Sequence, residues 1–290
     1  DPKVKNILEG IDDPRLKVIH QANTGFLGAI KNAIAHASGE FIAIHGAGDV
    51  SYPDRITTQA AYLDQHPNIA AVSCHFENTI FGGPSDGHTT LNSNTKDKLN
   101  TADFLHEHNP FSHGEVMFRK TAYLEVGGYR DFFKFAQDLD LWIRMSEKFE
   151  MAIIHEVLYQ RRVFVADGIA ANRNKLILQK LLATFAIQCH FDRKNNGKDA
   201  IQVYGTQAGF FRRKDKSMAL FCANQAIESL YNGDDITVPI SIAKLALDNR
   251  FSLYTLLVNI LINMSKSRNF RKGLCFLISF HPRSSLWFRR

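Results

Sequence analysis

The sequence is 290 residues long, with 45% hydrophobic residues, 22% charged residues and a net charge of +6, the balance of a globular protein that folds in water. The apolar run at residues 253–264 is shorter than the ~18 residues that span a bilayer, which argues against a membrane-spanning helix. The four cysteines are far apart and no nucleic-acid-binding module is recognisable, so we expect reduced thiols, a cytoplasmic location and no nucleic-acid partner.

Strand-like and helix-like segments alternate along the first 165 residues. Short apolar runs predict the strands, and apolar residues at helical spacing predict the helices. The predicted strands are 15–20, 41–45, 69–77, 115–120 and one or two within 151–164, and the predicted helices are 25–37, 53–67, 121–130 and 138–149. This order indicates an α/β fold with a mostly parallel sheet flanked by helices. Residues 78–100 are polar and rich in turn formers, typical of either a mobile loop or an irregular hairpin.

After about residue 170 the pattern becomes helical throughout, with turn signals between the helices. We therefore expect an α/β domain at 1–168 and an all-helical region at 169–290. Basic residues flank the apolar helix predicted at 253–264: Arg268, Arg271, Lys272, Arg289 and Arg290. Two interpretations stay open for this region, a helical cap on the first domain and a peripheral anchor on an anionic membrane surface.

Three polar segments follow predicted strands or begin predicted helices, where ligands bind in open α/β sheets. In "HQANTG", Asn23 and Gly25 form a polar turn before a helix, which suits an anionic ligand but is also common in ordinary turns. In "GAGDVSYPDR", Asp49 can bind a ligand or cap the turn. In "FAQDLDLW", Asp138 can act as a base or serve as the N-cap of its helix.

Two further features have an ordinary structural interpretation beside the functional one. His113 lies in "NPFSHGEVMFRK", and a single histidine is more often a satisfied structural group than an acid, base or ligand. The pair Arg161 and Arg162 is typical of an exposed strand edge, but guanidinium groups near a site also bind phosphate.

The order of these segments resembles the GT-A glycosyltransferases of family 2, which are inverting enzymes that use nucleotide sugars. The resemblance rests on "HQANTGFLGAIKNAIAHASGEFIAIHGAGDVSYPDRITTQAAYLDQHP" and on "NPFSHGEVMFRKTAYLEVGGYRDFFKFAQDLDLWIRMSEKF". It covers about residues 1–165, with the Asn-x-Gly turn, the acidic region after a strand, the Gly-Gly-Tyr turn and the acid-Leu-Trp helix in the family's order.

The resemblance implies a GT-A sheet domain that binds a nucleotide-diphosphate sugar, with UDP, GDP or dTDP as the nucleotide. It implies that Asp138 is the catalytic base, and it assigns two further groups of residues. The donor-binding positions are Asn23, Gly25, Asn32, Asp49 and Arg55, and the acceptor-side positions are His113, Gly114 and Trp142. A divalent cation, Mg²⁺ or Mn²⁺, would neutralise the diphosphate, with Asp49 as its ligand.

The sequence departs from the family in two places. The family's acidic motif is here Gly46-Ala47-Gly48-Asp49, so its main metal-binding carboxylate aligns with Gly48. Three alternatives stay open: Asp49 binds the cation directly or through water, His45 or His113 assists it, or the enzyme works without a tightly bound metal. The chain also opens inside what looks like a helix, so we expect the family's first strand and its nucleotide-binding turn to lie before Asp1, making this an N-terminally truncated form. A non-catalytic binding or scaffold module with a degenerate site is therefore the alternative function.

The expected function is transfer of a hexose-type sugar to a hydroxyl of a glycan or a lipid-linked acceptor, with inversion. Cell-surface polysaccharide, lipopolysaccharide or glycan synthesis is the expected setting. The expected location is the cytoplasm, including the inner face of the membrane if the C-terminal helices bind lipid.

Overall fold

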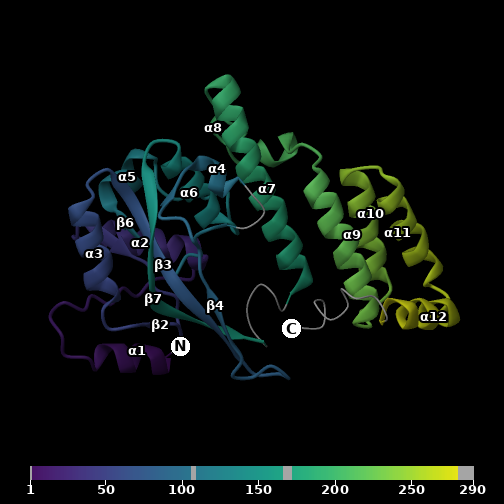
Figure 1. The fold of residues 1–290 in the computed structure, drawn as a ribbon, viewed down its shortest axis with the longest axis horizontal. Helices are drawn as coiled ribbons and strands as arrows, with labels where there is room; N and C mark the ends of the chain where they lie inside the picture. Colours follow the sequence, from purple (N-terminus) through teal and green to yellow (C-terminus); the bar gives the residue numbers. More distant parts are fainter. Residues whose placement is uncertain (1, 106–108, 166–171, 280–290) are drawn as a thin grey trace.

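The computed structural model describes residues 2–105, 109–165 and 172–279. A sheet with flanking helices forms one half of the molecule and helices alone form the other, with the long helix α7 (Arg173–Asn196) between them (Figure 1). The boundary expected between residues 168 and 169, and the basic residues Arg289 and Arg290, lie outside the described residues.

Seven strands in the described part of the chain form one sheet with the order β1-β6-β3-β7-β2, while β4 pairs with β3 and β5 pairs with β7. The strands are β1 (Phe41–Ala43), β2 (Val50–Ser51), β3 (Ile69–Phe81), β4 (Thr89–Asn92), β5 (Lys98–Leu99), β6 (Met117–Arg119) and β7 (Glu150–Phe164). The two long strands, β3 and β7, run parallel, and the other pairings are antiparallel. Residues 76–92 form a hairpin, because β3 continues to Phe81 and β4 returns along it, whereas β5 pairs with β7.

The α/β class is confirmed, but the sheet is mixed and not mostly parallel. Residues 15–20, which we expected to form a strand, form none. A strand needs a neighbour to accept and donate its backbone hydrogen bonds, and no described segment pairs with residues 15–20. The neighbour of β1 in the sheet is β6, and the two strands are antiparallel.

Helices cover both faces of the sheet because their apolar stripes pack against it; α1 is the exception, since its Val4 and Ile7 are exposed. The helices are α1 (Pro2–Glu9), α2 (Gly25–His36), α3 (Arg55–Gln65), α4 (Thr101–Phe104), α5 (Lys120–Glu125) and α6 (Gln137–Ser146). One core joins Ile34 of α2, Phe118 of β6 and Trp142 of α6. A second core joins Leu63 of α3 to Ile154 of β7. The sheet is thus enclosed between two apolar layers.

The C-terminal half is all-helical, as expected. After α7 it contains α8 (Ala200–Tyr204), a 3-10 helix η1 (Gly205–Phe211), α9 (Lys216–Tyr231), α10 (Thr237–Asn249), α11 (Leu253–Met264) and α12 (Arg268–Ser279). α7 contributes to two cores: Phe185 and Cys189 pack into the core beneath α6, whereas Ile177 packs into the core of α9 to α11. One helix therefore connects the two halves.

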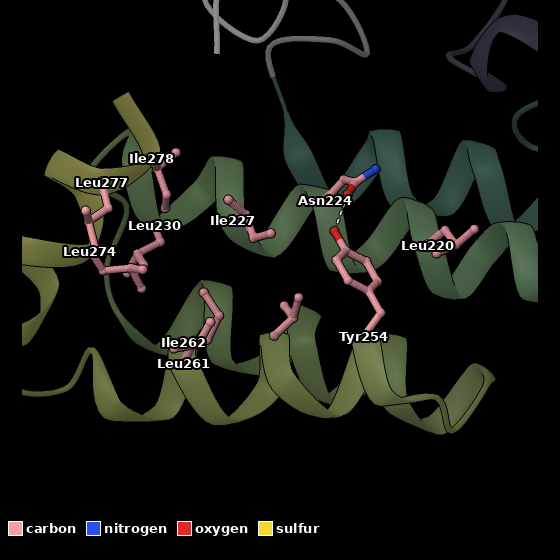
Figure 2. A pocket seen from close by; sticks show the side chains of 11 residues that line it. Leu220, Asn224, Ile227, Leu230, Tyr254, Leu261, Ile262, Leu274, Leu277 and Ile278 are labelled. Atoms are coloured by element: carbon pink, nitrogen blue, oxygen red, sulfur yellow. Dashed lines mark hydrogen bonds between the residues drawn. The ribbon is translucent and has the colours of Figure 1, made fainter. Parts of the chain in front are cut away.

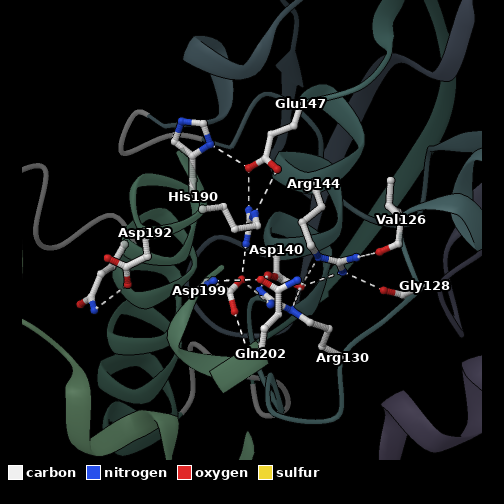
Figure 3. A network of polar contacts seen from close by, with 12 residues as sticks. Val126, Gly128, Arg130, Asp140, Arg144, Glu147, His190, Asp192, Asp199 and Gln202 are labelled. Atoms are coloured by element: carbon white, nitrogen blue, oxygen red, sulfur yellow. Dashed lines mark hydrogen bonds and ion pairs between the residues drawn. The ribbon is translucent and has the colours of Figure 1, made fainter. Parts of the chain in front are cut away.

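A buried ion network fixes α7 and α8 to the sheet domain (Figure 3). Arg130 binds Asp140 of α6 and also Asp199, the N-cap of α8, with an Nη1–Oδ2 distance of 2.7 Å to Asp199. Arg193 of α7 binds Asp199 and Glu147, the latter at 2.6 Å. Asp140 and Asp199 are almost fully buried, so the guanidinium groups supply charge compensation that water cannot.

The helical half also holds an apolar cavity of about 670 Å³ between α9, α11 and α12 (Figure 2). Leucine and isoleucine side chains line most of it, and the Tyr254 hydroxyl donates to Asn224 Oδ1 at 2.8 Å on one side. Among the described helices, none combines the length and the apolarity needed to cross a bilayer.

Candidate functional site

Asp138 lies in the first turn of α6, at a strained entry into the helix. The N-cap is Ala136, which makes no side-chain capping bond, so Asp138 is not the cap that the sequence left open. Ala136 has φ 56° and ψ 25°, and among the described residues it alone has a positive φ without being glycine. Left-handed backbone at a residue other than glycine costs energy and occurs preferentially at functional sites. The strained turn therefore sets the direction in which α6 presents Asp138.

The environment of Asp138 favours its neutral form. Burial in the protein raises the pKa of its carboxyl from 3.8 to about 6, while the backbone N–H groups of Leu139 and Asp138 act in the opposite direction. The side-chain amide of Asn109 donates to Oδ2 at 3.3 Å. A carboxylate with a pKa close to neutral pH is well matched to accepting a proton from a hydroxyl group.

Three aromatic residues, His113, Tyr129 and Trp142, pack together near Asp138. The Tyr129 hydroxyl and Nε2 of His113 are 2.6 Å apart, and the rings of His113 and Trp142 lie 6.4 Å apart. Burial lowers the pKa of His113 to about 4, so the imidazole is neutral at pH 7. Burial, and then the charge of Asp138, raise the pKa of Tyr129, so the phenol keeps its proton. Both groups are therefore uncharged at neutral pH, and they share one partly buried hydrogen bond.

The turn at residues 46–49 is tied to β7 by Asp49. The Tyr159 hydroxyl donates to Oδ2 of Asp49 at 2.6 Å, and the backbone N–H of Arg162 donates to Oδ1 at 2.8 Å. The backbone N–H of Gly46 donates to the Tyr159 oxygen at 3.0 Å. The burial of Tyr159 and its bond to Asp49 raise the pKa of the phenol, so it remains a donor. These hydrogen bonds of Asp49, Tyr159 and the N–H groups of Gly46 and Arg162 join the turn to β7, and we call them the latch.

Two glycines leave the space that this latch occupies. A Cβ atom at Gly46 would collide with the Asp49 carboxylate, and a Cβ atom at Gly114 would collide with the Tyr159 hydroxyl. Gly48 has φ +89°, a conformation that side chains disfavour. The glycines that stand where the family has acids are therefore required by the packing of this turn.

The described residues of this turn do not fit the divalent cation that we expected. Mg²⁺ and Mn²⁺ need several oxygen ligands, but Gly46 and Gly48 have no side chain and both oxygens of Asp49 already accept hydrogen bonds. Across the part of the chain that the structure describes, no cluster of three or more His, Cys, Asp or Glu side chains could hold a metal ion. A cation at Asp49 would have to displace the latch.

The turn at residues 23–25 lies beside the acceptor-side residues. Asn23 Oδ1 accepts a hydrogen bond from the Gly25 N–H at 2.9 Å, and Gly25 has φ +73°. Asn32 donates to Gln21, which supports the same turn from α2. The ring of Phe26 stands 5.5 Å from that of His113, edge to face. The predicted donor-binding turn is thus brought next to the predicted acceptor side.

Arg55 requires a correction, because it does not face a ligand. The residue is 0% exposed, and its donors bind the Ile44 carbonyl at 2.7 Å, Ser51 Oγ at 2.8 Å and Gln59 Oε1 at 3.1 Å. Its guanidinium carbon lies 4.7 Å from the centre of the Tyr159 ring. Arg55 supports the end of β1 and the ring of Tyr159. Its role is therefore structural, and it does not make the contact with the sugar donor that we predicted.

Residues 109–115 connect the two parts of the site. Asn109 binds Asp138 at one end, and Gly114 packs against Tyr159, and so against the latch, at the other. Sequence reasoning did not find Asn109, Tyr129 or Tyr159 as site residues. Tyr159 contacts Gly46 and Asp49, which lie more than 100 positions away, and no spacing rule predicts such a contact. The signal in the sequence is that Gly46 and Gly114, which make room for the Tyr159 hydroxyl and its partner, are both glycine.

Comparison with known proteins points to one family. Residues 2–127 match the model of the family described as glycosyl transferase family 2. This part of the chain is therefore similar to glycosyltransferase family 2.

Two proteins named as glycosyltransferases are among the relatives of this chain. The chain is 28% identical to the putative glycosyltransferase EpsE of Bacillus subtilis, over 51% of this chain and 52% of that protein. It is 24% identical to the amylovoran biosynthesis glycosyltransferase AmsE of Erwinia amylovora, over 51% and 54%. It is also 30% identical to the uncharacterized protein y4gI of Sinorhizobium fredii, over 60% of this chain and 19% of that protein.

The matched regions therefore span about half the length of the two glycosyltransferases and about a fifth of y4gI. Among solved structures, the chain is similar to Staphylococcus aureus TarS 1-349, with a TM-score of 0.45 and 11% identity over 94% of this chain and 79% of that one.

Proposed function

We propose that this protein transfers a sugar from a nucleotide-diphosphate sugar to a hydroxyl group of an acceptor, with inversion at the anomeric carbon. The family match supports a transferase of this class. The observation that carries the proposal is Asp138: its carboxyl has a pKa of about 6, and it stands at a strained helix start next to the predicted donor and acceptor residues.

The reaction follows from the chemistry of that carboxylate. The ionised Asp138 accepts the proton of the acceptor hydroxyl while the hydroxyl oxygen forms a bond to the anomeric carbon. The bond from that carbon to the diphosphate oxygen breaks, and the nucleoside diphosphate leaves with the electron pair. Because attack and departure occur on opposite faces of the sugar, the configuration inverts.

The remaining residues hold the substrates in this scheme. The turn of Asn23 and Gly25, with Asn32 behind it, lies against the donor, and Asp49 shapes its diphosphate side through the latch. His113 and Gly114 line the acceptor side, where the neutral imidazole offers a surface for a sugar ring. Trp142, predicted on the same side, is 0% exposed, so its indole packs against His113 from the core and does not meet the acceptor. A UDP-, GDP- or dTDP-sugar is the donor class, and a glycan or lipid-linked glycan is the acceptor class. The similarity to AmsE, an amylovoran biosynthesis glycosyltransferase, supports polysaccharide assembly as the setting.

The test is a donor screen by mass spectrometry, with UDP-, GDP- and dTDP-sugars and simple glycosides as acceptors. Asp138→Asn removes the base but keeps the shape, so we expect transfer to fall by at least about a hundredfold while donor binding changes less than about threefold. Asp131→Asn, at a carboxylate that is 80% exposed, is the matched control and retains activity. Full transfer by the Asp138→Asn protein would refute the base assignment.

The same preparations separate this proposal from the alternative, a non-catalytic module. A scaffold with a degenerate site would neither transfer nor hydrolyse any of these donors, and Asp138→Asn would change nothing that the screen measures. Turnover of a nucleotide sugar that depends on Asp138 excludes it.

A further inference from the structure

The diphosphate that leaves in the proposed reaction carries several negative charges, and catalysis requires positive charge or fixed donors next to it. The expected source, a divalent cation on Asp49, does not fit the described turn. Asp49 already accepts from the Tyr159 hydroxyl and the Arg162 N–H, and Gly46 and Gly48 contribute no ligand. The positive charge or the fixed donors at this site must therefore come from other groups.

The geometry of β7 separates the two arginines next to the latch. Along this part of the strand Tyr159 pairs with Phe76, Arg161 with Asn78 and Arg162 with Thr79, without a shift in register. Side chains alternate between the two faces of a sheet. Arg161 therefore lies on the face of Tyr159, and Arg162 lies on the opposite face.

Arg161 is free to meet a ligand on that face. Its side chain is exposed, and its guanidinium carbon lies 5.9 Å from the centre of the Phe76 ring. Within the described residues, no acidic group forms an ion pair with it. Arg162 is equally exposed and lies 5.5 Å from the centre of the Phe81 ring, but on the other face.

The surroundings of Arg161 leave its charge largely uncompensated. Glu115 interacts with Arg161 through space, but it is 0% exposed, and burial raises the pKa of its carboxyl. The negative charge of Glu115 is thereby suppressed. Glu115 follows Gly114, whose backbone packs against the Tyr159 hydroxyl, so Arg161 shares its face with the segment that leads to Asp138.

We propose that Arg161 binds the diphosphate of the nucleotide-sugar donor directly, in place of a divalent cation, and that Asp49 and Tyr159 hold the adjoining turn. This inference rests on the proposed function, because it names the group that binds that donor. A guanidinium group suits the task, since its planar donors match two phosphate oxygens and its charge does not depend on pH.

The experiment is titration calorimetry of the whole chain with UDP, GDP and dTDP, each in EDTA and in Mn²⁺. We expect at least one nucleotide to bind with an affinity that differs by less than about twofold between EDTA and Mn²⁺. Arg161→Gln weakens that binding by about tenfold or more, and Arg161→Lys, which keeps the charge but not the fork, has an intermediate effect. Arg162→Gln is the matched control, an exposed arginine on the opposite face of the same strand, and it changes binding by less than about twofold. Thermal unfolding of the Arg161→Gln protein matches that of the wild type, because an exposed side chain without an ion pair is removed.

The outcomes separate this inference from the function on which it rests. Binding that needs Mn²⁺, disappears in Asp49→Ala and is unchanged in Arg161→Gln would overturn the inference and leave the transferase proposal standing. Binding in EDTA that Arg161→Gln does not weaken would also overturn it. If the wild-type chain binds none of the three nucleotides under either condition, both this inference and the donor assignment are wrong.

Discussion

At the scale of single residues, the site is shaped by groups whose surroundings change their ordinary behaviour. Burial moves the pKa of Asp138 upward and that of His113 downward, so a carboxylate becomes a better base and an imidazole stays neutral. The Asp49 carboxylate accepts hydrogen bonds from the Tyr159 phenol and from the backbone N–H of Arg162. The acid that survives in the degenerate motif therefore has a different role from the acid that is missing.

Replacing Asp138 with asparagine should stabilise the protein. The folded-state pKa of about 6 exceeds the ordinary value of 3.8, so the folded protein holds this proton more tightly and loses stability as the pH rises between those values. At pH 7.5 the wild type bears the cost of the buried charge, which Asp138→Asn removes. We expect a gain of about 1–3 kcal/mol in the free energy of unfolding, measured with urea at pH 7.5 and, as a control, at pH 4, where the gain should nearly vanish. An equal change at both pH values would contradict the shifted pKa.

The latch should behave as one energetic unit. Tyr159→Phe and Asp49→Ala each remove the same hydrogen bond, and each should cost about 1–2 kcal/mol of stability. Because the bond is shared, the double variant should cost less than the sum, with a coupling of about 1 kcal/mol. A double-mutant cycle in urea measures this coupling, and strictly additive costs would show that the two side chains act independently.

At the scale of elements, α6 connects the site to the rest of the molecule. It carries both Asp138 and Asp140 in its first turn, and Asp140 belongs to the buried ion network that reaches α7 and α8. Arg144 of the same helix donates to the carbonyls of Val126 and Gly128 at 2.5 and 2.7 Å, which fixes the turn before it (Figure 3). The direction of Asp138 thus depends on helices far along the chain.

Breaking the network at its centre should be costly. Arg130→Met leaves Asp140 and Asp199 without a shared partner in a buried place, and we expect a loss of about 3–5 kcal/mol. Arg15→Met, at an ion pair whose arginine is 89% exposed, is the control and should leave the free energy of unfolding nearly unchanged. Urea unfolding of the two variants makes the comparison, and similar small losses in both would mean that the network adds no stability.

Local patterns predicted most of these elements, but they did not predict the contacts between them. The apolar spacing of residues 25–37 and 138–149 predicted α2 and α6, since each forms from its own sequence. The run at 15–20 was misread as a strand, because an apolar run does not reveal whether a partner strand lies beside it. The resemblance placed Asp138, His113 and Asp49 in one region, and the structure brings their segments together. The roles of Arg55 and Tyr159 depend on burial and on pairing across more than 100 residues, which no local pattern encodes.

At the scale of the whole molecule, a sheet domain with the site is joined to a helical half through α7 (Figure 1). The helical half presents apolar side chains to solvent: Leu253, Leu257 and Ile260 of α11 are 72%, 47% and 44% exposed. Arg268 and Lys272 of α12 are exposed beside this region in sequence. Peripheral membrane contact, one of the two interpretations that the sequence left open, stays a prediction.

That prediction concerns lipid charge. If apolar and basic residues of the helical half bind a membrane, the chain should sediment with vesicles that contain anionic lipid and much less with neutral vesicles. Arg268→Glu combined with Lys272→Glu should reduce the bound fraction several-fold, while Lys98→Glu on β5 in the sheet domain serves as the control. Equal sedimentation with both lipid types, or none with either, favours a helical cap over an anchor.

If Asp138 is the base of the proposed sugar transfer, its ionisation should govern the pH dependence of kcat. With the donor and acceptor found in the screen, kcat for the wild type should be level above about pH 7. It should fall about tenfold per unit below about pH 6, because protonation removes the base. The Asp138→Asn protein should show a low rate without this ionisation. A wild-type profile with no ionisation near pH 6, or the same profile in both proteins, would contradict the account.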